Sequence, residues 1–447
     1  MSLLFYLKKQ PKIIVLIIMF FSFRAYTSEI LLQGFNWESF RYGHDTGISW
    51  YKRLNKQVPN LREVGFTGIW LPPPSEAYDG EGNLANHSRG YMPTNLYDLD
   101  TWYGSKKELI DLNHDLRKAG ISPIADIVIN HRAASAKDER GCWTIFESPN
   151  WDATAVVNND SMGCGLGSPD TGYEINSFAD IDHNNDSVRY SLAEWLQWLR
   201  KDIGFRGLRY DVSHGYAGKF VAYYNQSFKK DFQEEPFFSI GEVWTMGPEK
   251  WEWSDQIGQR DEIVHWIDST WKNITSPSNA SFAFDFSNRK SLHMAIVKNE
   301  FGRLVNESGK PMGVMGTWPE KSVTFIENHD TGSTQQRDLF SFDPNVLLQG
   351  YAYILTHPGT PMVYYDHMYY FEGKMYFQIK DMMQLRHRLG IHSGSSVEII
   401  EASNGLYAAE IDGKLAMKIG PKLWSPKGAD WQMILFGHNF AIFEKKN

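Results

Sequence analysis

Positive charge, cysteine and long apolar runs are all scarce in this chain of 447 residues. Lys and Arg total 45 against 53 Asp and Glu, which gives a net charge of −8. A nucleic-acid-binding surface needs clustered positive charge to neutralise phosphates, so this composition argues against a nucleic-acid partner. The apolar stretch from Ile13 to Phe23 is too short to span a bilayer comfortably, which argues against a membrane-embedded protein.

The first residues have the pattern of an export signal. Lys8, Lys9 and Lys12 precede the apolar stretch, and that stretch has the length of a signal-peptide core. We predict that residues 1–28 are a signal peptide, and that the mature chain is secreted to the extracellular space without stable membrane insertion. An uncleaved anchor is the alternative.

The only two cysteines, Cys142 and Cys164, lie in one stretch rich in Gly, Asn and Ser. In an exported protein, two cysteines this close predict one disulfide, which would stabilise the fold by about 2–4 kcal/mol. Two free thiols are the alternative, which export disfavours.

Strand-like apolar runs alternate with helix-like segments along most of the chain. The expected strands are 29–35, 67–74, 122–130, 207–211, 238–244, 281–286, 323–330 and 360–367. The expected helices are 50–64, 106–118, 186–201, 219–229, 261–273, 288–297, 346–355 and 377–389. This alternation predicts an α/β protein, a closed (β/α)8 TIM barrel with its site at the C-terminal ends of the strands. A doubly wound open sheet is the alternative, but no G-x-G-x-x-G follows the first strand.

Two segments depart from the alternation and predict additional domains. Between His131 and Asp182, Gly, Asn, Asp and Pro crowd together without periodicity, which predicts an inserted domain at 131–182. The barrel then comprises residues 29–130 and 183–391. Residues 392–447 show period-two patches and turns, which predict a small C-terminal antiparallel β-sheet domain.

Three carboxylates end apolar runs that we expect to be barrel strands: Asp211, Glu242 and Asp330. A buried run that ends in a carboxylate is unusual unless the charge serves chemistry at the mouth of the strand. Carboxylates gathered in one cleft raise the pKa of at least one of them, which separates an ionised nucleophile from a protonated acid. Glycoside hydrolysis with retention uses this division, with carboxylates about 5–5.5 Å apart. Arg209 points the same way as Asp211 along its strand and can keep that nucleophile ionised.

Other interpretations of the three acids are weaker. A single acid at a strand end is usually a helix cap, but three in succession make caps improbable. A metal-dependent hydrolase would also use carboxylates, yet the histidines are scattered and no H-E-x-x-H motif occurs. The 16 Trp and 22 Tyr favour a sugar substrate, since their rings combine an apolar face with a polar edge, although most must be core.

The chain resembles the α-amylase family of glycoside hydrolases (family 13), and specifically its plant-like members. The resemblance rests on LLQGFNWES, GIWLPPPSEA, GYMPTNLYDLD, GISPIADIVINHR, DIDHNND, GEVW, ENHDTGSTQ and GYAYILTHPGTP, in this order. It extends from about Ile30 to Lys446, nearly the whole mature chain.

The resemblance implies a role for each candidate site residue. Asp211 would be the nucleophile, Glu242 the general acid and base, and Asp330 the residue that stabilises the transition state. The implied substrate-binding residues are Tyr91, Met92, His131, Arg209, Trp244 and His329. Among these, Tyr91 would stack on the sugar ring and the two histidines would bind its hydroxyls.

The resemblance also implies at least one Ca²⁺ ion. Calcium prefers six to eight oxygen ligands from carboxylates, amides and backbone carbonyls. Matching positions provide the side chains of Asn130, Asp170 and Asp180 and the carbonyls of Tyr173 and Gly215.

Together these features predict a secreted, calcium-dependent α-amylase. It would cleave internal α-1,4 bonds of starch, glycogen and related α-glucans, with retention of configuration, and act as a monomer. A maltooligosaccharide-forming amylase of the same family is the first alternative. A non-catalytic, amylase-like sugar-binding or membrane-associated protein is the second.

Overall fold

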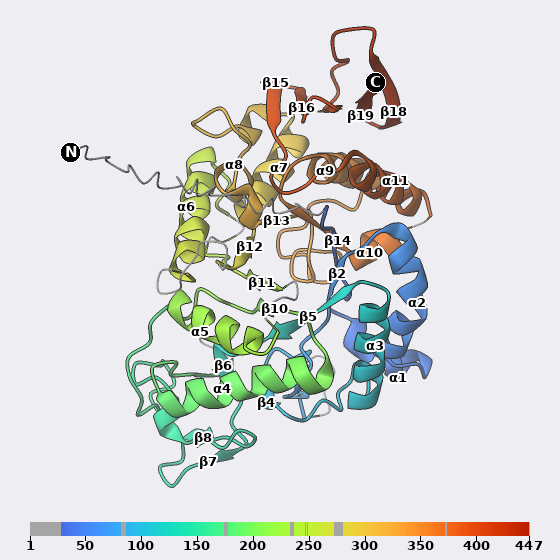
Figure 1. The fold of residues 1–447 in the computed structure, drawn as a ribbon. Coiled ribbons are helices and arrows are strands. Elements are labelled where there is room, and N and C mark those ends of the chain that lie inside the picture. The colour runs from blue at the N-terminus through green and yellow to red at the C-terminus, as the bar shows by residue number, and fades with distance from the viewer. Residues whose placement is uncertain are drawn as a thin grey trace, which may run out of the picture.

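The protein folds around a closed barrel of eight parallel strands (Figure 1). The computed structural model describes residues 28–81, 86–173, 178–232, 237–245, 247, 249–271, 280–371 and 373–446. The strands of the barrel are β1 (Leu31–Gln33), β2 (Gly68–Trp70), β5 (Ser122–Ile127), β10 (Gly207–Tyr210), β11 (Phe238–Gly241), β12 (Phe282–Phe284), β13 (Ser322–Phe325) and β14 (Thr360–Tyr364). They follow one another around the barrel in chain order, and β14 closes it against β1. The predicted (β/α)8 barrel is confirmed.

Helices cover the outside of the barrel (Figure 1). The larger ones are α2 (Trp50–Val64), α3 (Lys106–Lys118), α4 (Asp186–Trp198), α5 (Gly218–Lys229), α6 (Trp253–Ser269), α7 (Phe286–Lys298), α9 (Pro344–Thr356) and α11 (Lys374–Leu389). The short helices are α1 (Tyr42–Thr46), α8 (Val314–Thr317) and α10 (Tyr365–Tyr369). Ser105 and Glu108 form a reciprocal capping box that starts α3 where the sequence predicts it.

Two of the predicted helices differ most at their ends, while the others agree to within three residues. The helix expected from 261 begins at Trp253, because Glu252 and Asp255 form a capping box there. The helix expected to reach 201 leaves the α-helical pattern after Trp198 and continues as a π-helical segment, Leu199–Ile203.

A five-stranded antiparallel sheet follows the barrel, as predicted. Its strands are β15 (Val397–Ser403), β16 (Leu406–Ile411), β17 (Leu415–Ile419), β18 (Trp431–Gly437) and β19 (Phe440–Lys445), in the order β15-β16-β17-β19-β18. Helix α9 of the barrel packs against β17 and β19. Buried side chains from Ile30 to Ile442 form one continuous core, which joins this sheet to the barrel.

The segment between β5 and α4 contains only short strands. They are β6 (His131–Arg132), β7 (Ala136–Lys137), β8 (Trp143–Ile145) and β9 (Ala179–Asp180), while β3 (Glu76–Ala77) and β4 (Pro93–Asn95) pair nearby. The predicted disulfide between Cys142 and Cys164 is present. Buried Arg132 lies over the rings of Phe146 and Trp151 and donates to backbone carbonyls, so a cation holds these loops together.

The predicted signal peptide is residues 1–28, and all of these except Ser28 lie outside the described part of the chain. Within the described residues, no helix is both long enough and apolar enough to cross a membrane.

Candidate active site

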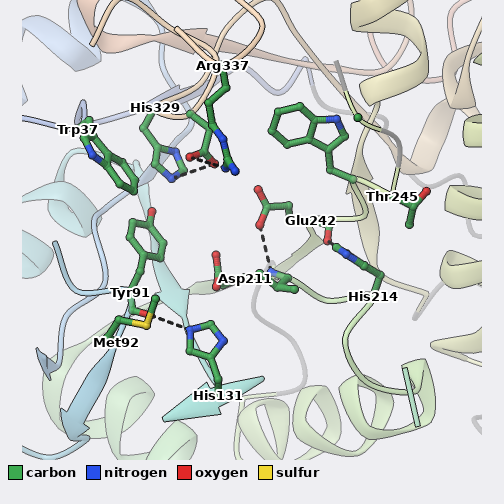
Figure 2. Close-up of a pocket in the computed structure, with 14 residues that line it drawn as sticks. Trp37, Tyr91, Met92, His131, Asp211, His214, Glu242, Thr245, His329 and Arg337 are labelled. Carbon is green, nitrogen blue, oxygen red and sulfur yellow. Dashed lines mark hydrogen bonds and ion pairs between the residues drawn. The ribbon is translucent and has the colours of Figure 1, made fainter. Parts of the chain in front are cut away.

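The three acidic residues lie around one cavity at the C-terminal mouth of the barrel (Figure 2). Asp211 directly follows β10, Glu242 directly follows β11, and Asp330 lies beyond the end of β13. The cavity has a volume of about 640 Å³. Its lining residues are Trp37, Tyr91, Met92, His131, Asp211, Val212, His214, Glu242, Trp244, Thr245, Gly247, His329, Asp330 and Arg337. Every predicted catalytic and substrate-binding residue therefore lines this cavity except Arg209, which is buried and contacts Asp211 and Glu242.

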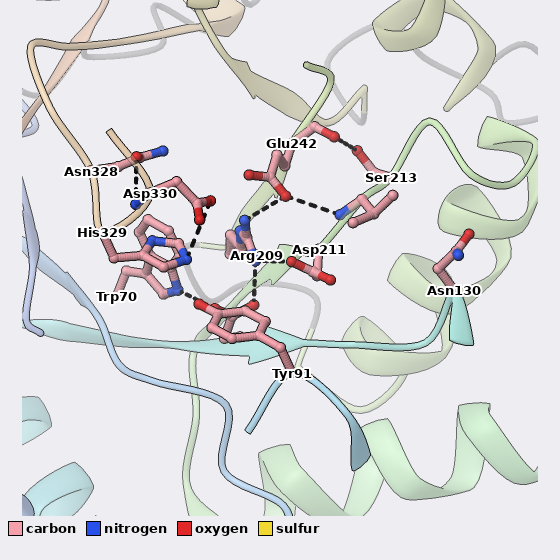
Figure 3. A network of polar contacts seen from close by, with 12 residues as sticks. Trp70, Tyr91, Asn130, Arg209, Asp211, Ser213, Glu242, Asn328, His329 and Asp330 are labelled. Carbon is pink, nitrogen blue, oxygen red and sulfur yellow. Dashed lines mark hydrogen bonds and ion pairs between the residues drawn. The ribbon is translucent and has the colours of Figure 1, made fainter. Parts of the chain in front are cut away.

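Arg209 is the centre of a buried ionic network (Figure 3). Its side chain is fully buried, and Nη1 lies 2.7 Å from Asp126 Oδ1 and 2.8 Å from Asp211 Oδ1. Nη2 lies 2.7 Å from Glu242 Oε2. One guanidinium thus contacts three carboxylates from β5 and the ends of β10 and β11, which sets their relative positions.

Ionising all the carboxylates around Arg209 at once costs free energy, because they are buried and close together. Burial raises the pKa of Asp211 well above its usual range, Arg209 lowers it, and the charges of Glu242 and Asp126 raise it. Burial and the Glu242 charge also raise the pKa of Asp330 to about 7. Arg209 acts in the predicted direction, but burial outweighs it for Asp211. Burial therefore favours the protonated forms of Asp211 and Asp330, and the Arg209 charge opposes that effect.

The chain bends sharply directly after Asp211. Val212 has a φ of +41°, a left-handed conformation that β-branched residues rarely adopt. Its backbone N–H donates to Glu242 Oε2 at 3.1 Å. Ser213 donates to the Glu242 carbonyl from its N–H at 3.1 Å and from Oγ at 2.9 Å. This strained turn fixes the nucleophile candidate relative to the acid candidate.

Aromatic rings form one wall of the cavity (Figure 2). The ring of Tyr91 stacks on His329 at 5.2 Å and on Trp37 at 5.6 Å between centroids. Gln33 Nε2 donates to His329 Nδ1 at 2.8 Å, so His329 carries its proton on Nε2, which lies 3.6 Å from Asp330 Oδ2. Burial lowers the pKa of His329 well below its usual range, so the ring is neutral and its Nε2–H is a donor directed at Asp330.

The opposite wall is held by a second ring pair. Trp244 stacks on Phe286 at 5.0 Å with an interplanar angle of 10°. His131 lies on the floor and contacts the Tyr91 carbonyl through Nε2 at 2.9 Å. A cleft with aromatic walls and carboxylates on its floor can hold a sugar ring by its faces while acids act on the bond.

Comparison with known proteins decides the family. The family model for the alpha-amylase catalytic domain matches residues 37–154, and that for the alpha-amylase C-terminal beta-sheet domain matches 388–444. Probable alpha-amylase 2 of Arabidopsis thaliana is 38% identical over 421 residues, covering 93% of this chain and 94% of that protein. The chain belongs to the α-amylase family. It is a glycoside hydrolase of that family.

A further relative and one solved structure are also similar to this chain. Alpha-amylase 3, chloroplastic, of Arabidopsis thaliana is 39% identical over 424 residues. The alignment covers 93% of this chain and 44% of that protein. A solved Anoxybacillus α-amylase superposes with a TM-score of 0.62 at 15% identity, covering 94% of this chain and 97% of its own. The second likeness concerns the fold alone.

The structure adds residues to this α-amylase site that the sequence analysis missed. Asp126 is 1% exposed and accepts hydrogen bonds from Tyr91 Oη at 2.9 Å and Trp70 Nε1 at 3.0 Å. Its signal was a carboxylate in the middle of the apolar run SPIADIVIN. Trp37 and Arg337 had no comparable signal, because an aromatic residue and an arginine in polar loops are common on any surface.

Arg337 is the exposed cation of the cleft. Its Nη1 lies 3.7 Å from Asp330 Oδ1, its guanidinium lies 5.9 Å from the Trp244 ring, and its side chain is 63% exposed. Its charge lowers the pKa of Asp330 against the effects of burial and Glu242.

Arg337→Gln is therefore expected to move the limb of the kcat/KM profile that reports Asp330 to higher pH. The loss of kcat/KM at neutral pH should stay below about 5-fold, since an exposed pair contributes at most about 1 kcal/mol. Arg337→Lys should keep the limb near its original position. Lys52→Gln removes an exposed charge outside the cavity and is the control; an equal movement in both variants would contradict this role of Arg337.

Two of the predicted calcium-ligand residues, Asn130 and Gly215, lie against one another. Asn130 is fully buried, and within the described chain its Oδ1 has no hydrogen-bond partner. A Cβ at Gly215 would lie 1.9 Å from Asn130 Oδ1, and one at Gly172 would lie 2.6 Å from the Gly215 carbonyl oxygen. Close approach of this kind needs glycine, and it places the Gly215 backbone beside the Asn130 amide oxygen.

The remaining predicted ligands lie on segments that are hydrogen-bonded to β6, to the loop after β10 or to each other. Asp180 pairs with His131 across β6 and β9, and the Tyr173 N–H donates to the His214 carbonyl at 3.1 Å. Asp170 begins the turn that leads to Tyr173, and its Oδ1 accepts from Gly172 N at 3.1 Å. Among described residues, no group of three or more His, Cys, Asp or Glu could hold a metal. The donors are instead a mixed oxygen set, which fits calcium better than a transition metal.

Proposed function

We propose that this family member is a secreted, calcium-dependent α-amylase that cleaves internal α-1,4 bonds of starch, glycogen and related glucans with retention. The observation that carries the proposal is the shared cavity of Asp211, Glu242 and Asp330 above the Arg209 network. It brings three carboxylates and aromatic walls together around one cavity, which is what cleavage of a neutral sugar polymer requires.

The residues divide the reaction as follows. Asp211 attacks the anomeric carbon while Glu242 gives its proton to the leaving oxygen, and a glycosyl–Asp211 ester forms. Glu242 then takes a proton from water, which attacks the same carbon and releases Asp211. Two inversions at one carbon give retention.

Other residues prepare this chemistry. The Val212 N–H and Arg209 hold Glu242 Oε2 beside the nucleophile. Asp330 and the neutral His329 bind hydroxyls of the sugar and stabilise positive charge that develops on its ring. Tyr91, Met92, His131 and Trp244 complete the walls that orient the chain.

The test is a product analysis on soluble starch. A mixed ladder of oligosaccharides whose new reducing ends are first α, as read by proton NMR, supports endo action with retention. One dominant oligosaccharide would support the maltooligosaccharide-forming alternative, and β ends would contradict retention. Absence of any α-glucan cleavage would leave the non-catalytic alternative.

Calcium would be held by Asn130, Asp170, Asp180 and the carbonyls of Tyr173 and Gly215. When bound, the ion supplies positive charge that links the inserted segment to the loop after β10. Chelation is expected to lower activity and melting temperature together, because an ion at 100 times its Kd stabilises the fold by about 2.7 kcal/mol. The melting temperature should fall by several degrees.

The chelation experiment has a matched pair of variants. Asp186→Asn, at a highly exposed carboxylate, should respond to chelator like the wild type. Asn130→Ala should start lower and change little on chelation. Adding calcium, but not magnesium, should restore the activity and melting temperature of the chelated wild type, since magnesium demands a tighter octahedral site. A wild type with unchanged melting temperature in chelator would refute the calcium site.

Organisation and location are part of the same proposal. We assign 1–28 to a signal peptide, 29–130 and 183–391 to the barrel, 131–182 to the inserted domain and 392–447 to the C-terminal domain. The Cys142–Cys164 disulfide supports export, since such bonds persist in oxidising compartments. Expression of the full chain with mass analysis of the secreted N-terminus tests cleavage, and light scattering tests the monomer.

A further inference from the structure

A second cavity of about 640 Å³ lies in the connection between β2 and α3. One chain segment separates it from the catalytic cavity: Tyr91 and Met92 line the catalytic side, whereas Gly90 and Thr94 line the second cavity. Its volume lies within the range of ligand sites, about 300–1,000 Å³. None of the catalytic residues proposed above belongs to it.

The polar groups of this cavity select a neutral, hydroxyl-rich ligand. Glu76, Asp79 and Asp100 are exposed carboxylates in its wall, and none of its described lining residues is Lys or Arg. Phosphates and carboxylates would be repelled by such a wall. Hydroxyl groups can donate to the three carboxylates.

Each of these carboxylates is already oriented by a hydrogen bond from the protein. Glu76 Oε2 accepts from Thr94 Oγ1 at 3.1 Å, and Asp79 Oδ1 accepts from Glu81 N at 2.9 Å. Asp100 Oδ1 accepts from Lys106 N at 2.8 Å. These bonds occupy one oxygen of each group and hold it in place, which lowers the entropy lost when a ligand hydroxyl binds.

His87 is a buried residue of the same wall. His87 is 5% exposed, and its Nδ1 accepts from Arg89 N at 2.8 Å, so the proton of the neutral ring is on Nε2. Burial lowers the pKa of His87 to about 4, which keeps the ring neutral. Within the described chain Nε2 has no hydrogen-bond partner, and a buried donor without an acceptor is costly.

Aromatic side chains complete the wall. Tyr78 and Trp102 are half-buried and line the cavity beside Tyr103, and the Trp102 ring meets His87 edge-on at 5.1 Å. Rings bordered by oriented acceptors match the apolar faces and hydroxyl edges of glucosyl units.

We propose that this cavity is a second binding site for an α-glucan chain. The inference rests on the proposed function for the identity of the sugar. A polymer bound there lies beside the catalytic cleft, which raises the effective substrate concentration at the acids.

The test is calorimetric titration of Glu242→Gln with maltoheptaose, whose cleavage is slowed by loss of the general acid. Two sites per chain are expected. The double variant Glu242→Gln, Trp102→Ala should bind one maltoheptaose per chain. The double variant Glu242→Gln, Asp79→Ala should keep two sites, one of them with at least 5-fold weaker affinity. Trp251→Ala, at a 46% exposed tryptophan outside both cavities, is the matched control and should keep two sites at unchanged affinity.

Each outcome decides the proposal. A stoichiometry of one in Glu242→Gln overturns it, as do two unaltered sites in both combined variants. If Trp102→Ala lowers the melting temperature markedly, the result of the variant at the exposed Asp79 alone tests the proposal. Hydrolysis of starch by the wild type with one-site binding in Glu242→Gln would reject this site and leave the proposed function intact.

Discussion

Glu242→Gln is expected to lower kcat on soluble starch by about 10²–10⁴-fold, the usual contribution of a general acid. Glutamine keeps the size of the side chain and can still accept from the Val212 N–H, but it has no proton to give to the leaving oxygen. Binding of maltooligosaccharides should persist. Steady-state kinetics and calorimetry on the same preparation check both parts.

The leaving group distinguishes an acid from a nucleophile. With α-maltosyl fluoride, whose fluoride departs without protonation, Glu242→Gln should recover much of its first-step rate, whereas Asp211→Asn should not. Glu63→Gln, at a 67% exposed carboxylate on α2, controls for loss of one charge. Equal losses of Glu242→Gln on starch and on the fluoride would remove Glu242 from the role of acid.

Arg209→Leu is expected to destabilise the fold by about 3–5 kcal/mol and to abolish measurable activity. Removing one partner of a buried ionic cluster leaves the others uncompensated, and here the guanidinium contacts Asp126, Asp211 and Glu242. Arg209→Lys should lie between wild type and Arg209→Leu, because one ammonium cannot span three carboxylates as a planar fork does. Urea unfolding followed by circular dichroism gives the free energies.

The pH dependence of the Arg209→Leu deficit has a definite sign. Burial raises the folded-state pKa of Asp211 and brings that of Asp330 to about 7, so their ionisation opposes folding above their unfolded values. Loss of the cation raises these pKa values further. The deficit should therefore be largest near pH 8 and shrink as pH falls toward about 5. A deficit independent of pH would indicate a packing defect, and Lys52→Gln, at an exposed side chain outside the cavity, supplies the control.

The barrel could be predicted because its signals are local. Each strand is an apolar run, and α2 and α3 begin at Ser49 and Ser105 caps and end at the residues that the periodicity indicates. Helix α6 was placed too late, because its first turns are set by the Glu252–Asp255 capping box rather than by apolar spacing. Local chemistry outweighed periodicity there.

The candidate site was only partly readable in the sequence. Asp211, Glu242 and Asp330 stood out because they end apolar runs, and family resemblance supplied the calcium ligands. Asp126 was missed although it is as buried as the strand around it. Its partners Arg209, Tyr91 and Trp70 come from other strands and loops, and no local pattern specifies such contacts.

The sequence by itself determined the barrel, the antiparallel sheet that follows it and the three acids at strand ends, since apolar periodicity and strand-terminal charge are properties of short segments. Only the tertiary structure decided that Arg209 contacts three carboxylates, that Arg337 lies beside Asp330 and that Val212 is strained next to Glu242. It also decided that the Gly90–Thr94 segment lies between two cavities. These features depend on which distant segments meet when the barrel closes, and closure depends on the whole core rather than on any one segment.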